Sequence, residues 1–166
     1  NFPEGRTIAD LSDNWKVSFD ASKRGPKNPV EFKTLSDWTL STNDSVKYFS
    51  GTAIYKKSFN LNEIQKDKKV MLNLGLLTSM AKVKLNGKEL GGVWTAPWTL
   101  DVTSALKVGN NELEISVVNN WMNRLIGDLK IPVNERPTWT PVFPYKADSP
   151  LQASGLFGPV SIQQAD

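Results

Sequence analysis

The polar residues best suited to binding chemistry gather in one stretch, residues 119–128, which reads Asn-Asn-Trp-Met-Asn-Arg-Leu-Ile-Gly-Asp. Paired hydrogen bonds from Arg and Asp can hold the vicinal hydroxyls of a sugar, so Asn123, Arg124 and Asp128 are candidate binding residues. The alternative is a buried ion pair between Arg124 and Asp128 that braces the loop. Gly127 beside Asp128 predicts a tight turn that needs side-chain caps, which favours the bracing role.

Aromatic rings supply a second set of candidate binding residues. Trp94, Trp121 and Trp139 fall at predicted strand ends or in the long loop 130–150, which also holds Tyr145 and many prolines. Such rings can stack on the apolar face of a sugar or pack against another protein surface. A loop of this length is usually functional, and its prolines preclude a central strand. Ligand contact, simple packing and a domain interface all stay open at this point.

Composition restricts the residues that can act as catalytic acids or bases. The chain has neither cysteine nor histidine, which excludes disulfides, thiolate chemistry, Cys/His zinc sites and imidazole bases. A stand-alone glycosidase would need two facing carboxylates about 5 to 10 Å apart. Its candidates, Glu112 and Glu114, fall on the polar face of a predicted strand. No catalytic residue is therefore assigned.

Charge and hydropathy bear on the classes of partner. The net charge is +3, from 20 basic and 17 acidic residues, and the basic side chains are scattered. Nucleic-acid binding would need a concentrated basic patch with interleaved aromatics, so none is expected. No apolar run approaches the roughly 18 residues that span a membrane, so no membrane partner is expected. No cofactor is expected either; calcium stays an alternative because it needs only carboxylate and carbonyl oxygens, although no dense Asp/Asn loop is present.

The elements that position these residues are predicted to be short strands. Residues 80–94 alternate apolar and polar side chains on both sides of Asn86 and Gly87, two residues that tolerate positive φ, which predicts a tight hairpin. No stretch of ten or more residues has a strong helical period. We therefore expect residues 1–166 to form a single all-β domain, an antiparallel β-sandwich of jelly-roll type. Further extended candidates are residues 46–61, 70–74 and 113–117.

Several strings occur in a characteristic order: Gly-Thr-Ala-Ile-Tyr at 51–55, Leu-Asn-Leu-Gly at 72–75, Ala-Lys-Val-Lys-Leu-Asn-Gly at 81–87, Leu-Asp-Val-Thr at 100–103 and Ser-Gly-Leu-Phe-Gly-Pro-Val at 154–160. Together they resemble the galactose-binding-like (sugar-binding) domain of family 2 glycoside hydrolases. A closer likeness is to the terminal β-sandwich of large family 106 rhamnosidase-like glycosidases. That likeness is carried by Tyr-Phe-Ser-Gly-Thr at 48–52 and by residues 121–128 and 154–160.

The resemblance implies a non-catalytic accessory module, carbohydrate-binding or domain-anchoring, in a larger glycoside hydrolase. The acid and base carboxylates of such enzymes belong to a separate (β/α)₈ barrel. The implied partners are carbohydrate, the catalytic domain, or both, and the aromatic surface is then more readily explained as a domain interface. We also expect the chain to be a piece of a longer multidomain protein that is secreted or periplasmic.

The sequence departs from the family 2 pattern near its closing motif. Gly158 stands where that motif normally has Arg, and residues 147–152 read Ala-Asp-Ser-Pro-Leu-Gln in place of an acidic-Trp-Arg group. The family's group can reach the active site of the neighbouring barrel, so the missing Trp and Arg argue against that contact here. Asp148 remains nearby. A stand-alone enzyme and a structural spacer without ligand are the competing interpretations.

Overall fold

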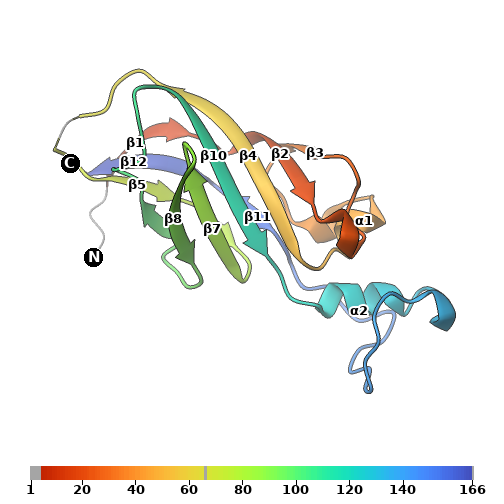
Figure 1. Ribbon diagram of the computed structural model, residues 1–166. Helices are drawn as coiled ribbons and strands as arrows, with labels where there is room; N and C mark the ends of the chain where they lie inside the picture. The colour runs from red at the N-terminus through yellow and green to blue at the C-terminus, as the bar shows by residue number, and fades with distance from the viewer. Residues whose placement is uncertain (1–4, 66, 166) are drawn as a thin grey trace.

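Two antiparallel sheets face each other in the computed structural model, which describes residues 5–65 and 67–165 (Figure 1). The larger sheet has six strands in the order β3-β2-β4-β10-β7-β8: β2 (Asp13–Phe19), β3 (Val30–Thr34), β4 (Thr52–Leu61), β7 (Met80–Leu85), β8 (Lys88–Val93) and β10 (Gly109–Val118). The smaller sheet has four, in the order β1-β12-β5-β9: β1 (Gly5–Asp10), β5 (Val70–Asn73), β9 (Thr99–Asp101) and β12 (Ser161–Ala165). A separate short pair joins β6 (Leu76–Leu77) to β11 (Leu156–Gly158). The predicted all-β antiparallel sandwich is confirmed.

The core between the sheets follows from alternation along each strand. Leu113, Ile115 and Val117 on β10 are buried, and the residues between them face outward. From the other sheet, Leu72 on β5 and Ile162 on β12 join the same hydrophobic cluster. Burying a side chain of this size stabilises the fold by about 1.5–3 kcal/mol. The alternation of apolar and polar residues along the strands therefore places the apolar face of each sheet in one shared core.

One end of the core is aromatic and carries a buried hydroxyl. Trp38, on the 3₁₀ helix η2 (Trp38–Leu40), is fully buried and donates from Nε1 to the Tyr55 hydroxyl at 2.6 Å. The same hydroxyl accepts from the Leu156 backbone N–H at 3.3 Å. Burial raises the pKa of Tyr55 to about 12, although these two hydrogen bonds act in the opposite direction.

The hairpin of β7 and β8 turns where the sequence predicts. Asn86 and Gly87 both have positive φ, 51° and 82°, as a tight primed turn requires. The Asn86 side chain also donates to the Ala105 carbonyl and the Asn111 amide oxygen, each at 2.8 Å, and accepts from the Glu112 N–H at 2.9 Å. The turn is thus fixed both by local backbone preference and by a buried amide network.

The expectation of an extended segment from residue 46 is wrong at its start. A short helix, α1 (Asp44–Lys47), occupies the first residues, and β4 begins only at Thr52. The helix starts because the Asn43 side chain accepts from the Ser45 N–H at 3.0 Å, a standard N-cap interaction.

The predicted tight turn at Gly127 and Asp128 is also wrong, because both residues lie in helix α2 (Met122–Asp128). Gly127 is required there by packing and not by turn geometry. A Cβ at this position would lie 2.6 Å from Cγ of Tyr48, so the helix can approach that ring only through glycine.

β1 and β12 run side by side along one edge of the smaller sheet, and Gly5 is paired with Ala165. Within the described residues, no helix is long and apolar enough to cross a membrane.

Candidate functional site

Helix α2 and the segment after it project beyond the end of the two sheets, next to the end of β10 (Figure 1). The segment contains one short 3₁₀ helix, η3 (Val133–Glu135), and otherwise irregular backbone. Large apolar side chains at the start of α2 and in this segment face solvent: Trp121 is 62% exposed and Trp139 is 84% exposed. We call the exposed set the α2–loop surface; it comprises Trp121, Val133, Trp139, Val142 and Phe143.

The polar residues predicted from the sequence brace this surface from inside. Arg124 donates from Nε to Oδ1 of the fully buried Asp128 at 2.8 Å, and its Nη2 lies 2.6 Å from the same oxygen. The other Asp128 oxygen accepts from the backbone N–H and the hydroxyl of Thr138. The buried ion pair considered as the alternative is therefore present, and it ties the loop to α2.

Asn123 braces a different segment. Its side chain is buried, donates to the Gln152 carbonyl at 2.6 Å and accepts from the Gln152 N–H at 2.8 Å. The Asn123 Nδ2 also lies 3.1 Å from the Ser154 hydroxyl. Asn123, Arg124 and Asp128 thus share one helix, but their polar groups are engaged inside the chain. Their predicted contact with a sugar stays a prediction.

The remaining predicted residues are not all brought together. Tyr145 lies half-buried in the same loop as Trp139. Trp94 is 71% exposed but directly follows β8, the edge strand of the larger sheet. The end of β8 and helix α2 are well separated in Figure 1, so Trp94 does not belong to the α2–loop surface.

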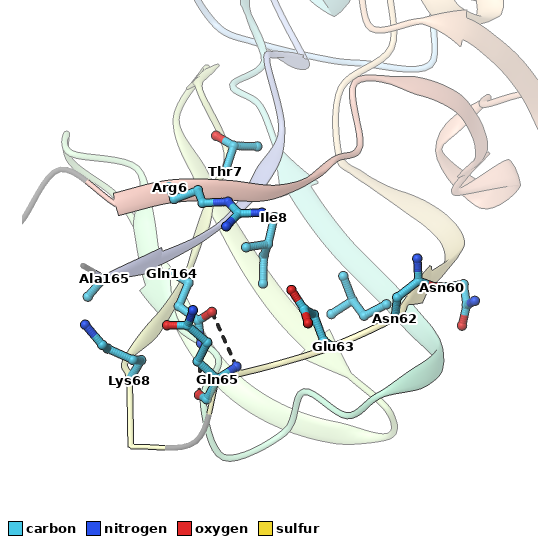
Figure 2. Close-up of a pocket in the computed structure, with 11 residues that line it drawn as sticks. Arg6, Thr7, Ile8, Asn60, Asn62, Glu63, Gln65, Lys68, Gln164 and Ala165 are labelled. Atoms are coloured by element: carbon cyan, nitrogen blue, oxygen red, sulfur yellow. Dashed lines mark hydrogen bonds between the residues drawn. The ribbon is translucent and has the colours of Figure 1, made fainter.

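A polar groove of about 650 Å³ lies away from all of the predicted site residues (Figure 2). Its walls come from β1, the end of β4, the connection after β4 and the end of β12. Figure 2 shows Ile8 pointing from β1 toward the connection that carries Glu63. Gln164 is buried and closes one side, because its Nε2 donates to the Gln65 carbonyl at 3.0 Å. The polar lining residues are Arg6, Thr7, Asn60, Asn62, Glu63, Gln65, Lys68 and Gln164.

Amide, guanidinium and carboxylate groups in such a groove can exchange hydrogen bonds with the hydroxyls of a polar ligand. No sequence pattern indicates this groove, since Arg6, Glu63 and Gln164 are remote from one another in the chain and only folding makes them neighbours.

Glu112 and Glu114, the candidate carboxyl groups, do not form a paired catalytic acid and base. Glu112 accepts from Ser58, and Glu114 forms an ion pair with Lys56 at 3.1 Å. Hydrogen bonds from Asn110 and Ser58 lower the pKa of Glu112, whereas a glycosidase acid needs a raised pKa. The geometry on this face favours surface pairing over catalysis.

Comparison with known proteins identifies relatives of this chain. The family described as "Glycosyl hydrolase 2 galactose-binding domain-like" matches residues 30–141. A protein of Formosa agariphila named "Putative beta-glucuronidase" is 38% identical over 92% of this chain. A beta-galactosidase of Thermoanaerobacter pseudethanolicus is 32% identical over 65% of the chain.

Among solved structures, a rhamnosidase from Novosphingobium sp. PP1Y superposes with a TM-score of 0.88, at 39% identity over 96% of this chain. The chain spans only 15% of the length of that rhamnosidase and 15% of the Formosa protein. A beta-glucuronidase of an uncultured Clostridium has the same fold, with a TM-score of 0.58. The sandwich, the ordered strings and the matched residues agree: the chain belongs to the glycosyl hydrolase 2 galactose-binding domain-like family.

Proposed function

We propose that this chain is a non-catalytic module of a larger glycoside hydrolase, and that it docks on the catalytic domain through the α2–loop surface. The exposure of Trp121 and Trp139 carries the proposal. Large apolar side chains that are exposed at the start of α2 and in the loop after it are a feature of interaction sites. The relatives named above are sugar-hydrolysing enzymes several times longer than this chain, which supports a role within such an enzyme.

Internal hydrogen bonds hold the α2–loop surface in place, which supports its use as a preformed docking surface. The Asp128 carboxylate joins α2 to Thr138, and Asn123 joins α2 to residue Gln152. A surface held in this way loses little conformational entropy on binding, which favours association. The Asn123 and Asp128 side chains, which were candidates for sugar contact, already have internal partners, so the exposed rings are what this surface offers to a partner.

The test is to produce the chain and its catalytic domain as separate polypeptides and to measure their association by titration calorimetry. Trp139→Ala should weaken association about tenfold or more, as expected for a central aromatic contact. Trp94→Ala is the matched control, because Trp94 is also mostly exposed but lies elsewhere, and it should leave association unchanged. Loss of glycan binding by the isolated chain on Trp139→Ala, with association unaffected, would overturn the proposal.

A second function, weak binding of a neutral saccharide, is favoured by the polar lining of the groove in Figure 2. The groove offers donors and acceptors from Arg6, Asn60 and Glu63, which suit sugar hydroxyls. On a glycan array, Glu63→Gln with Asn60→Ala should abolish any signal from neutral oligosaccharides. A signal that survives both changes would show that the groove is not the site.

A further inference from the structure

A small cationic pocket lies between helix α2 and the 3₁₀ helix η1 (Ala21–Lys23), apart from the groove in Figure 2. Its volume is about 210 Å³. This is below the roughly 300–1,000 Å³ typical of sites for drug-sized ligands, so it suits a single sugar ring. The lining residues are Ser22, Lys23, Arg24, Ser50, Trp121, Arg124, Pro137 and Thr138.

Arg124 is held in place by the groups behind it. Asp128 binds its Nε and Nη2, and Thr138 binds the second oxygen of Asp128. Within the described residues, the Arg124 Nη1 group has no hydrogen-bond partner in the chain. A guanidinium fixed on one edge presents its remaining N–H groups as a pre-organised donor.

The charge of the pocket is positive after internal pairing. Arg124 is neutralised by Asp128, but Lys23 and Arg24 take part in none of the ion pairs of the described chain, which are Lys56–Glu114, Lys57–Asp13 and Arg124–Asp128. Arg24 is positioned by a left-handed backbone, with φ of 63°, and by a hydrogen bond from Nη2 to the Glu135 carbonyl at 3.2 Å. Lys23 and Arg24 can therefore still bind an anion.

An exposed ring completes the pocket. Trp121 lines it and is mostly solvent-exposed, so its face is available for the C–H face of a sugar ring. The hydroxyls of Ser22 and Thr138 and the buried Ser50 lie in the same lining. These hydroxyls donate their protons within the chain, so their oxygens are left to accept from sugar hydroxyls. Cations, a ring and acceptor oxygens in one pocket match the three chemical features of an acidic sugar: a carboxylate, an apolar ring face and hydroxyls.

We propose that the pocket between η1 and α2 binds a sugar that carries a carboxylate, as in a uronic acid. The carboxylate is bound by Arg24 and Lys23, with Arg124 donating beside them, and the sugar ring packs on Trp121. This inference rests on the proposed function only in taking the ligand to be a saccharide. Trp121 belongs both to the α2–loop surface and to the pocket, whereas the other docking side chains, Val133, Trp139, Val142 and Phe143, do not line the pocket.

The experiment is a titration of the ¹⁵N-labelled 166-residue chain, followed by NMR, with D-glucuronate, D-glucose and acetate in parallel. Glucuronate should shift the Trp121 Nε1–H and Arg124 Nε–H signals in a saturable way. Glucose should bind about tenfold more weakly or worse, because it lacks the charged acceptor. A D-glucose 6-sulfate arm distinguishes the carboxylate from another anionic group, and equal binding of the sulfate would overturn the assignment to a carboxylate.

Substitutions test the assignment of the residues. Arg24→Gln and, separately, Lys23→Gln should each weaken glucuronate binding about tenfold without changing the thermal midpoint, since both side chains are at the surface. Lys27→Gln is the control, because Lys27 is exposed in the same segment but does not line the pocket.

Equal binding of glucose or acetate, or glucuronate binding that survives both Arg24→Gln and Lys23→Gln, would overturn the inference. Trp139→Ala should leave glucuronate binding intact. The measurements therefore distinguish a failure of the docking proposal from a failure of the uronic-acid proposal.

Discussion

At the scale of single residues, Val83 and Lys84 show how sharply the two faces of β7 differ. Val83 is 2% exposed within the core, and its neighbour Lys84 faces solvent. Val83→Asp should destabilise the fold by about 3 kcal/mol or more, because it buries an unpaired charge. Lys84→Asp should cost only about 1 kcal/mol or less, because the side chain faces solvent, although Glu114 and Glu89 lie opposite it on the neighbouring strands. Thermal denaturation of the two variants checks this, and equal losses would mean that the register of β7 is wrong.

Tyr55 makes stability depend on pH in the alkaline range. Its pKa is raised to about 12 by burial, whereas a tyrosine in the unfolded chain titrates near pH 10. The folded state therefore keeps its proton at a pH where the unfolded state loses it. This contribution is fully present below pH 10 and falls by about 1.4 kcal/mol per pH unit between pH 10 and 12.

Urea denaturation between pH 9 and 11.5 measures that slope. Tyr55→Phe should be less stable overall, since Trp38 loses its acceptor, but it should lack the slope that Tyr55 contributes. Tyr145→Phe is the control, because Tyr145 is only half-buried, and it should keep the wild-type slope. Parallel pH profiles for wild type and Tyr55→Phe would contradict the assignment.

At the scale of elements, the turn between β7 and β8 depends on backbone conformation more than on space. Gly87 has φ of 82°, and a Cβ there would meet nothing within 4 Å. Gly87→Val should nevertheless destabilise by roughly 1–3 kcal/mol, because a β-branched residue is strained at positive φ. Lys88→Val, on the adjoining strand position, should have little effect on the free energy of unfolding. Similar losses for the two variants would refute the turn assignment.

Helix α2 packs closely against the Tyr48 ring at Gly127. Gly127→Ala should destabilise by about 1–3 kcal/mol, although alanine is the better helix former, because its Cβ would collide with the Tyr48 ring. A double-mutant cycle with Tyr48→Ala checks the cause. The added loss from Gly127→Ala should largely disappear once the ring is removed, and an unchanged loss would rule out the collision.

The contrast between the hairpin and α2 shows which elements the sequence predicts. Asn86 and Gly87 lie between two alternating runs, so local chemistry alone specifies the turn. Helix α2 is seven residues long, and its N-cap residue, Trp121, makes no capping hydrogen bond; the Asn120 side chain accepts from the Met122 N–H instead. It is held by contacts with Tyr48, Thr138 and Gln152, which are remote in sequence or follow it. Periodicity therefore does not reveal this helix, and Gly127 beside Asp128 indicates a turn instead.

At the scale of the whole molecule, the sandwich was predictable because each strand carries its own alternation and all buried faces share one core. The binding surfaces were predictable only in part. Exposure of Trp139 follows from its place in a proline-rich loop, and Trp121 follows the end of a predicted strand, whereas the groove in Figure 2 and the pocket beside η1 combine residues from distant segments. Arg24 and Arg124 are one hundred positions apart in the chain, and no pattern in the sequence links them.

The pairing of Gly5 with Ala165 has a mechanical consequence. β1 and β12 are antiparallel, so tension applied at these two residues pulls neighbouring strands apart from one end. The load falls on one residue pair of the β1–β12 ladder at a time, from Gly5 and Ala165 toward Asp10 and Ser161, so the ladder unzips instead of shearing. β12 stays paired with β5 on its other side, so β1 peels away first. Under stretching, the sandwich should yield gradually at this seam, with little resistance, while the six-stranded sheet remains unloaded.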